Sequence, residues 1–109
     1  ISIPNIPSSD GAIYVNGDSM YPILKSGDII TYKRIDIDPQ KIFFGEMYVL
    51  AIKIDENTTL KTIKFIQKSD LGTNYIKLVS HNQHHIFKDV CLDEITAIGL
   101  VRASIRLHN

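Results

Sequence analysis

The stretch Thr58-Thr59-Leu60-Lys61-Thr62-Ile63-Lys64-Phe65-Ile66-Gln67 is rich in β-branched and aromatic residues and contains no glycine or proline. This composition fits a β-strand better than a helix. Successive side chains of a strand point to opposite faces of the sheet. The pattern therefore places Lys61 on one face with Ile63 and Phe65, and it places Lys64 on the other face.

Further short segments of this kind follow one another along the chain, separated by turn-forming residues. The strands that we expect are residues 12–16, 28–34, 46–54, 58–67, 74–80, 86–91 and 95–106. One short helical turn is expected from Met20 to Leu24. About seven short strands with little helix predict a mainly β fold, built as a folded-over sheet or a partly open barrel.

The beginning of the chain differs from the rest. Residues 1–11 contain Pro4, Pro7 and Gly11 and are typical of the end of a linker or of an N-terminal arm. We expect residues 12–109 to form one domain. With 109 residues, 44% of them hydrophobic, the chain is long enough to bury a core without disulfides.

The charge balance and the single cysteine narrow the function classes. Twelve basic and twelve acidic residues cancel, which argues against a nucleic-acid-binding surface on this chain. Cys91 has no partner for an internal disulfide, as expected in a reducing cytoplasm. No run of 18 apolar residues and no signal-peptide core occurs, so we expect a cytoplasmic protein without a membrane partner.

A serine lies among turn-forming residues in Gly17-Asp18-Ser19-Met20-Tyr21-Pro22. A serine hydroxyl is a weak nucleophile unless a neighbouring base takes its proton, and a lysine can act as that base only when it is uncharged. Burial lowers the pKa of a lysine. Since Lys61 has the more apolar neighbours on its strand face, we expect it to be the buried lysine. The alternative is that Lys61 and Lys64 are ordinary strand lysines with their ammonium groups in water.

Three motifs in this order resemble one known family. They are Gly17-Asp18-Ser19-Met20-x-Pro22, then Gly27-Asp28-Ile29-Ile30, then Thr59-Leu60-Lys61. The chain resembles the C-terminal domain of LexA and the phage repressors, which form the S24 group of self-cleaving peptidases. The resemblance runs from about Ala12 to Arg102 and includes the segment 95–102, which is of the kind that closes these domains.

The resemblance implies roles for individual residues. Ser19 would be the catalytic nucleophile and Lys61 the general base, a Ser/Lys variant of the catalytic triad that needs no carboxylate. The backbone N–H groups of Ser19 and its neighbour Met20 would bind the oxyanion. Asp18 is expected to be a turn residue, because a carboxylate beside the base would oppose its deprotonation. No cofactor and no metal are implied.

Two departures from the family pattern affect the expected function. Thr62 stands where the family often has a basic residue, and no Ala-Gly or Cys-Gly pair, the bond that these repressors cut, occurs in the chain. Because the chain begins at Ile1 rather than at a methionine, we expect the cleaved linker to lie upstream, together with a helix-turn-helix domain that alone contacts DNA. A repressor that no longer cleaves itself is the other explanation.

Two functional classes therefore stay open. The first is a regulator that dimerises through this domain and cleaves its own linker, with a RecA filament as co-protease during DNA damage. The second is a catalytically silent dimerisation module of a phage-type repressor. In either class we expect dimerisation through the last segment, Ile98 to Leu107, as an edge strand. A plain strand of a monomer fits this segment equally well. Signal peptidases share the Ser/Lys pair but are anchored in membranes.

Two further groups have alternative interpretations. His81, His84 and His85 could suggest a metal site, but they lie in a polar stretch without a thiol or carboxylate at ligand spacing, so a solvated loop is favoured. Phe43, Phe44 and Tyr48 could form a peptide-binding wall, but aromatic residues beside a strand start are more often part of the core.

Overall fold

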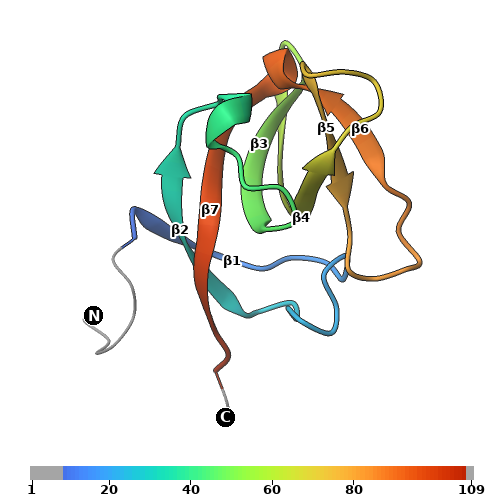
Figure 1. The fold of residues 1–109 in the computed structure, drawn as a ribbon. Coiled ribbons are helices and arrows are strands. Elements are labelled where there is room, and N and C mark those ends of the chain that lie inside the picture. The colour runs from blue at the N-terminus through green and yellow to red at the C-terminus, as the bar shows by residue number, and fades with distance from the viewer. Residues whose placement is uncertain (1–8, 108–109) are drawn as a thin grey trace.

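The computed structural model describes residues 9–107, which form a single antiparallel sheet of seven strands (Figure 1). The strands are β1 (Gly11–Tyr14), β2 (Ile29–Ile35), β3 (Met47–Asp55), β4 (Thr58–Lys68), β5 (Tyr75–Val79), β6 (Lys88–Cys91) and β7 (Ile95–Ile105). Two short 3₁₀ helices, η1 (Pro39–Lys41) and η2 (Leu92–Glu94), complete the fold. The described part of the chain has no α-helix, and so no helix long and apolar enough to cross a membrane. The prediction of a mainly β fold with about seven strands is confirmed.

The strands lie in the order β1-β2-β7-β3-β4-β5-β6, and the sheet curls without closing into a barrel (Figure 1). The prediction that the last segment is an edge strand is wrong, because β7 lies between β2 and β3. Its pairing with β3 ends at Leu100, however, and from Val101 to Ile105 it pairs with β2 alone. The carboxyl half of β7 therefore keeps one unpaired side among the described residues.

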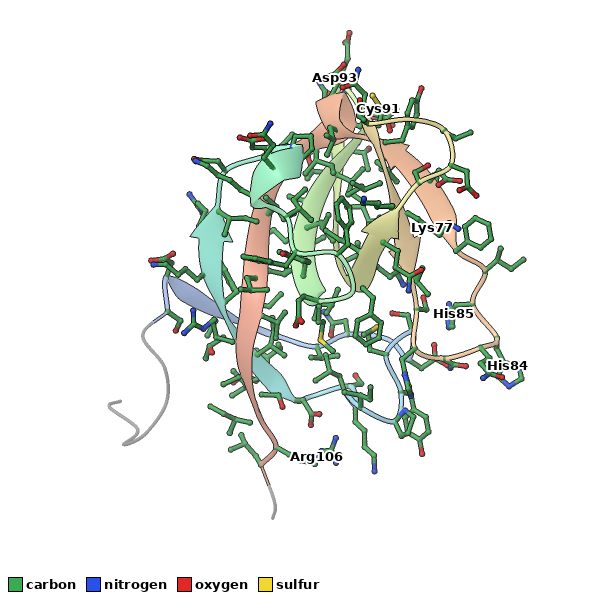
Figure 2. The ribbon with its side chains drawn as sticks, in the orientation of Figure 1. Lys77, His84, His85, Cys91, Asp93 and Arg106 are labelled. Carbon is green, nitrogen blue, oxygen red and sulfur yellow. The ribbon has the colours of Figure 1, made fainter. Side chains whose placement is uncertain are left out.

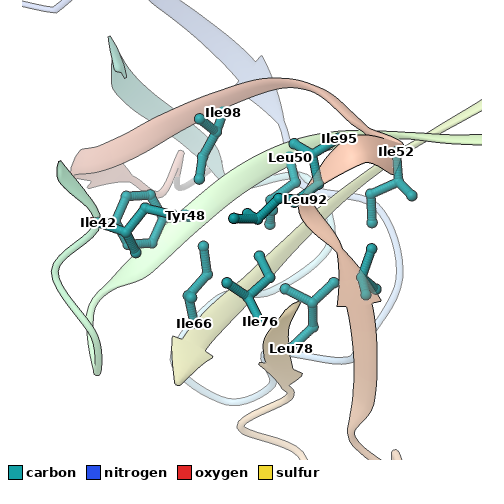
Figure 3. Packing of buried hydrophobic residues seen from close by; sticks show 11 residues of the cluster. Ile42, Tyr48, Leu50, Ile52, Ile66, Ile76, Leu78, Leu92, Ile95 and Ile98 are labelled. Atoms are coloured by element: carbon teal, nitrogen blue, oxygen red, sulfur yellow. The ribbon is translucent and has the colours of Figure 1, made fainter. Parts of the chain in front are cut away.

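Most of the buried apolar side chains form one large cluster between the curled halves of the sheet (Figure 3). The cluster consists of Ile42, Tyr48, Leu50, Ile52, Ile66, Ile76, Leu78, Val90, Leu92, Ile95 and Ile98. Apart from Ile42, which follows η1, these residues come from β3 to β7 and the short segments between them, so one core joins strands that lie far apart in the sequence. Burial of this much apolar surface is the main force that holds the curled sheet together.

A second, smaller cluster lies on the opposite face of β4. It is formed by Val15, Met20, Leu24, Ile30 and Ile63, with Phe65 among the partly buried residues packed against it. Ile66 belongs to the large cluster, whereas Ile63 and Phe65 belong to the small one. The predicted division of β4 into two faces is thus confirmed. The small cluster supports the loop that carries Ser19.

The three aromatic residues near the start of β3 do not share one environment. Tyr48 is fully buried, and its hydroxyl oxygen accepts a hydrogen bond of 2.8 Å from the Phe43 N–H. Burial raises the pKa of Tyr48. Phe43 and Phe44 are 67% and 38% exposed, so the prediction that they belong to the core is wrong. They precede β3 in the turn that is closed by the hydrogen bond from the Glu46 N–H to the Phe43 oxygen.

The beginning of the described chain is attached to the sheet. The Asp10 N–H donates to the Tyr32 carbonyl oxygen at 2.8 Å, and the Asp10 carboxylate accepts from the Arg34 N–H at 2.7 Å. Gly11, the last residue of the predicted arm, already belongs to β1. Residues 1–8 lie outside the described residues, and the division into an arm and a domain stays a prediction.

Candidate functional site

Ser19 lies in the loop that connects β1 to β2. The loop is closed at its base by two backbone hydrogen bonds, from the Val15 N–H to the Asp28 oxygen at 2.8 Å and from the Gly27 N–H to the Val15 oxygen at 2.9 Å. Met20 and Leu24 are each only 2% exposed and anchor the loop in the small apolar cluster. The loop is therefore held at its base and at its centre.

The chain turns sharply around the serine. Gly17 has a φ of +82°, a conformation that side chains other than that of glycine rarely adopt. The Tyr21 N–H donates to the Asp18 oxygen at 3.0 Å, and the Leu24 N–H donates to the Met20 oxygen at 2.9 Å. The second bond has α-helical spacing but is not continued, so the helical turn expected from Met20 to Leu24 is a series of hydrogen-bonded turns.

Two adjacent N–H groups of this loop matter for the expected oxyanion site. Within residues 9–107, the N–H groups of Ser19 and Met20 donate to no protein acceptor, whereas the carbonyl oxygens of Asp18 and Ser19 both accept hydrogen bonds. These are the two amides that the family resemblance assigned to the oxyanion. An oxyanion site needs such unpaired donors fixed in place beforehand.

A pocket of about 320 Å³ contains both Ser19 and Lys61. One wall is formed by the end of β1 and the following loop, from Ile13 to Gly17, and the other wall is formed by residues 61–63 of β4. The fold thus brings to one pocket a serine and a lysine that are far apart in the sequence. A neighbouring pocket of about 120 Å³ is also lined by Ile13 and Lys61.

The expected burial of Lys61 is wrong, because its side chain is exposed. No hydrogen bond joins Lys61 to Ser19 among those formed by residues 9–107. The cross-strand neighbour of Lys61 is the small Ala51, so little covers the amine. The pocket therefore contains both Ser19 and Lys61, but the Lys61 side chain stays in contact with water.

Lys64 is the lysine of β4 that is partly buried. Its Nζ donates to Ser80 Oγ at 2.9 Å. Burial lowers the pKa of Lys64, and the nearby charge of Asp18 opposes this effect. Comparison of neighbours along β4 alone missed this result, because the loop that covers Lys64 follows β5, in a distant part of the sequence.

That loop, residues 80–87, packs against the Ser19 loop and was not identified as functional from the sequence. The Asn82 N–H donates to the Ser19 oxygen at 2.9 Å, and Asn82 Nδ2 donates to the Asp18 oxygen at 3.1 Å. His85 Nε2 lies 2.8 Å from Asp18 Oδ1. In Figure 2, His85 points inward from the loop and His84 points away from it. We expected this loop to be a solvated connection, but it also holds the Ser19 loop through these contacts.

The histidines of this loop have separate environments. The His81 ring packs edge-on against the Phe65 ring, with 6.3 Å between the centroids, while His85 contacts Asp18. Among residues 9–107, no three histidine, cysteine, aspartate or glutamate side chains are grouped so that they could hold a metal ion.

An ion pair between the buried Asp28 and the more exposed Arg106 attaches the segment just after β7 to the Ser19 loop. Arg106 Nε and Nη2 donate to the two carboxylate oxygens of Asp28 at 3.0 and 2.9 Å, and the Asp28 side chain is 6% exposed. The hydrogen bonds from Arg106 hold the pKa of Asp28 below its ordinary value. Asp28 also accepts from the Lys25 N–H at 2.9 Å, so the pair fixes the turn that leads into β2.

A comparison with protein families identifies the family of this chain. The family model described as Peptidase S24-like matches residues 2–102 of the chain. No curated protein matches it. The matched range includes the Ser19 loop, β4 with Lys61, and the loop with Asn82.

Proposed function

The chain belongs to the Peptidase S24-like family, and from this premise we propose that it is the dimerisation and self-cleavage domain of a LexA-like or phage-repressor-like transcriptional regulator. The observation that supports this proposal most directly is the pocket that contains both Ser19 and Lys61. In this function Ser19 is the nucleophile and Lys61 is the general base.

The proposed reaction is the hydrolysis of one peptide bond in the protein's own linker. Ser19 Oγ forms a bond to the carbonyl carbon as its proton passes to an uncharged Lys61 amine. The negative charge that develops on the carbonyl oxygen is stabilised by the unpaired N–H groups of Ser19 and Met20. The carbon–nitrogen bond then breaks, the leaving amine takes the proton from Lys61, and water hydrolyses the acyl-enzyme.

Because Lys61 is exposed, the proposal must also explain how its amine becomes uncharged. A peptide segment that fills the pocket of about 320 Å³ displaces water from the amine. Loss of water favours the uncharged form of a lysine. We therefore propose that the segment to be cut helps to activate the base by occupying the pocket, so that the protein without it is latent.

Several partners belong to the same proposal. A RecA filament would stimulate the reaction in the cytoplasm by favouring the occupied pocket, and a separate domain of the regulator would contact DNA. Dimerisation would use the side of β7 that is unpaired after Leu100. An unpaired strand edge is a ready template for pairing with a second chain.

A catalytically silent dimerisation module is the second candidate function. The observations that favour it are the exposed Lys61 side chain and the lack of a hydrogen bond to Ser19 among the described residues. In this case the domain keeps the fold and the unpaired side of β7, and sedimentation shows a dimer without any cleavage.

The two candidates are distinguished by self-cleavage of the full-length protein at a pH of about 9 to 10, where more of an ordinary lysine is uncharged. We expect two fragments from the wild-type protein and none from Ser19→Ala or Lys61→Ala. Full-length protein that stays intact at high pH, with and without a RecA filament, contradicts self-cleavage. Cleavage that survives either substitution removes that residue from the mechanism.

A further inference from the structure

We propose that Asn82 is a positioning residue that orients the two backbone N–H groups of the oxyanion site. The inference rests on the proposed function of Ser19 and concerns a residue outside the Ser19–Lys61 pocket. Asn82 is partly buried, lies in the loop between β5 and β6, and is not among the residues that line that pocket. Any effect of Asn82 on the reaction therefore passes through the backbone that it holds.

The geometry of the peptide bond carries the argument. A peptide unit is planar, and in the trans form its carbonyl oxygen and its N–H point in opposite directions. The Asp18 oxygen and the Ser19 N–H belong to one such unit, and the Ser19 oxygen and the Met20 N–H belong to the next. A bond that fixes the oxygen of a unit therefore also fixes the direction of its N–H.

Asn82 holds both of these units. Its side-chain Nδ2 donates to the Asp18 oxygen at 3.1 Å, and its backbone N–H donates to the Ser19 oxygen at 2.9 Å. On the opposite side of each unit, the N–H groups of Ser19 and Met20 have no acceptor among residues 9–107. One residue thus holds two adjacent peptide units in an orientation that leaves both donors available to a ligand.

Asn82 is itself held in place. Its Oδ1 accepts from the His84 N–H at 3.1 Å, and its carbonyl oxygen accepts from the His85 N–H at 3.1 Å. An asparagine amide is suited to this position, because it donates at one end while it accepts at the other. Aspartate keeps the shape and the acceptor but provides no donor for the Asp18 oxygen.

The test uses the chain as it stands and a fluorophosphonate probe, with the label on Ser19 measured by intact-protein mass spectrometry. In this reaction Ser19 Oγ forms a bond to phosphorus, fluoride leaves, and the serine proton passes to Lys61. The phosphoryl oxygen takes the developing charge, so the rate depends on the oxyanion donors. The loss of an aligned donor lowers such rates by up to about 100-fold to 1000-fold.

We expect Asn82→Ala to slow labelling about tenfold to 100-fold at every pH, because the donors lose alignment while the base stays intact. The midpoint of the pH profile stays that of the wild type. Gln83→Ala, an exposed neighbour in the same loop, is the matched control and labels at the wild-type rate. Asn82→Asp is the second variant and removes the donor without removing the His84 contact. Wild-type labelling rates in both folded Asn82 variants overturn the inference and leave the proposed function standing.

A measurement of the amides themselves separates this inference from the proposed function. Asn82→Ala removes the side-chain bonds to the Asp18 oxygen and from the His84 N–H but keeps the backbone bond to the Ser19 oxygen. In ¹⁵N-resolved NMR spectra we therefore expect the Ser19 amide signal to shift and broaden more than that of Met20. Unchanged signals for both amides overturn the inference, whatever the labelling result. A wild-type protein that the probe does not label even at a pH of about 10, where part of an exposed lysine is uncharged without a peptide segment in the pocket, overturns the proposed function, and the amide signals then report only whether Asn82 orients the two N–H groups.

Discussion

The backbone N–H of Asn82 donates to the carbonyl oxygen of Ser19 at 2.9 Å, and this contact joins two loops that lie at opposite ends of the sheet order. The Ser19 loop follows the outer strand β1, and the Asn82 loop precedes the outer strand β6. They meet because the sheet curls. The position of the proposed nucleophile is therefore a property of the whole curled sheet and not of its own loop alone.

The first prediction distinguishes Lys61 from Lys64 in β4. Arginine stays charged and cannot act as a general base, so Lys61→Arg should slow self-cleavage of the full-length protein by about 100-fold or more. Lys64→Arg should keep the rate within about tenfold of the wild type, since Lys64 contacts Ser80 and is not among the residues that line the Ser19 pocket. Fragment formation over time measures both rates. The reverse result assigns the base to Lys64, whose pKa burial lowers.

The second prediction concerns the dependence of stability on pH. Because Arg106 lowers the pKa of Asp28, the pair stabilises the fold above the ordinary aspartate pKa of about 4. That stability is lost as the pH falls through the lowered pKa. Asp28→Asn should therefore reduce the thermal midpoint by several degrees at neutral pH, and the difference from the wild type should shrink in acid.

Asp36→Asn is the matched control for this measurement. Asp36 also forms an ion pair, with Lys41 at 2.7 Å, but both side chains are exposed. Exposed pairs contribute little to stability, so this variant should melt close to the wild-type temperature at neutral pH. Equal effects of the two substitutions contradict the structural role of the Asp28–Arg106 pair.

The third prediction tests the buried hydroxyl of Tyr48. Tyr48→Phe keeps the ring in the core but leaves the Phe43 N–H without its acceptor. We expect a loss of about 1 kcal/mol in the free energy of unfolding, measured by urea denaturation. Tyr14→Phe is the control, because Tyr14 is exposed and should tolerate the change. Equal stability of wild type and Tyr48→Phe contradicts a contribution from this hydrogen bond.

The fourth prediction concerns the close approach of Tyr32 to Gly99 on neighbouring strands. A Cβ atom at Gly99 would lie 2.6 Å from Tyr32 Cδ2, so Gly99→Ala forces the ring to move. We expect a loss of about 1–3 kcal/mol in the free energy of unfolding. In the double variant with Tyr32→Ala the clash is gone. The double variant should therefore lose less free energy of unfolding than the sum of the losses of the two single variants. Strict additivity contradicts this explanation.

The strands of this protein were predictable because local signals determine them. The alternation of Ile63, Lys64, Phe65 and Ile66 along β4 identified both the strand and its two faces, since the period of two depends on neighbouring residues only. The interior position of β7, between β2 and β3, was not predictable in the same way. Sequence patterns indicate that a segment is a strand, but strand order is set by contacts between distant segments.

The candidate site, like the fold, was predictable from the sequence only in part. The resemblance of the motifs around Ser19 and Lys61 to a known family selected two residues that line one pocket, whereas the strand pattern alone left Lys61 and Lys64 as ordinary strand lysines. Whether Lys61 or Lys64 is buried depends on the loop after β5. The residue pattern within β4 contains no information about that loop. Asn82 had a local signal, because asparagine favours the side-chain turn that it forms with the His84 N–H. Nothing in the local sequence indicated the contact between Asn82 and the Ser19 loop.

The Asp28–Arg106 pair has a practical consequence for anyone who engineers the carboxyl end of this domain. Arg106 is nearly the last described residue, and Figure 2 shows it at the tip of the molecule beyond the end of β7. An affinity tag fused close behind it, or a truncation that removes it, would disturb the anchor of the turn that follows the proposed nucleophile. Tags are therefore better placed at the amino end or behind a flexible spacer.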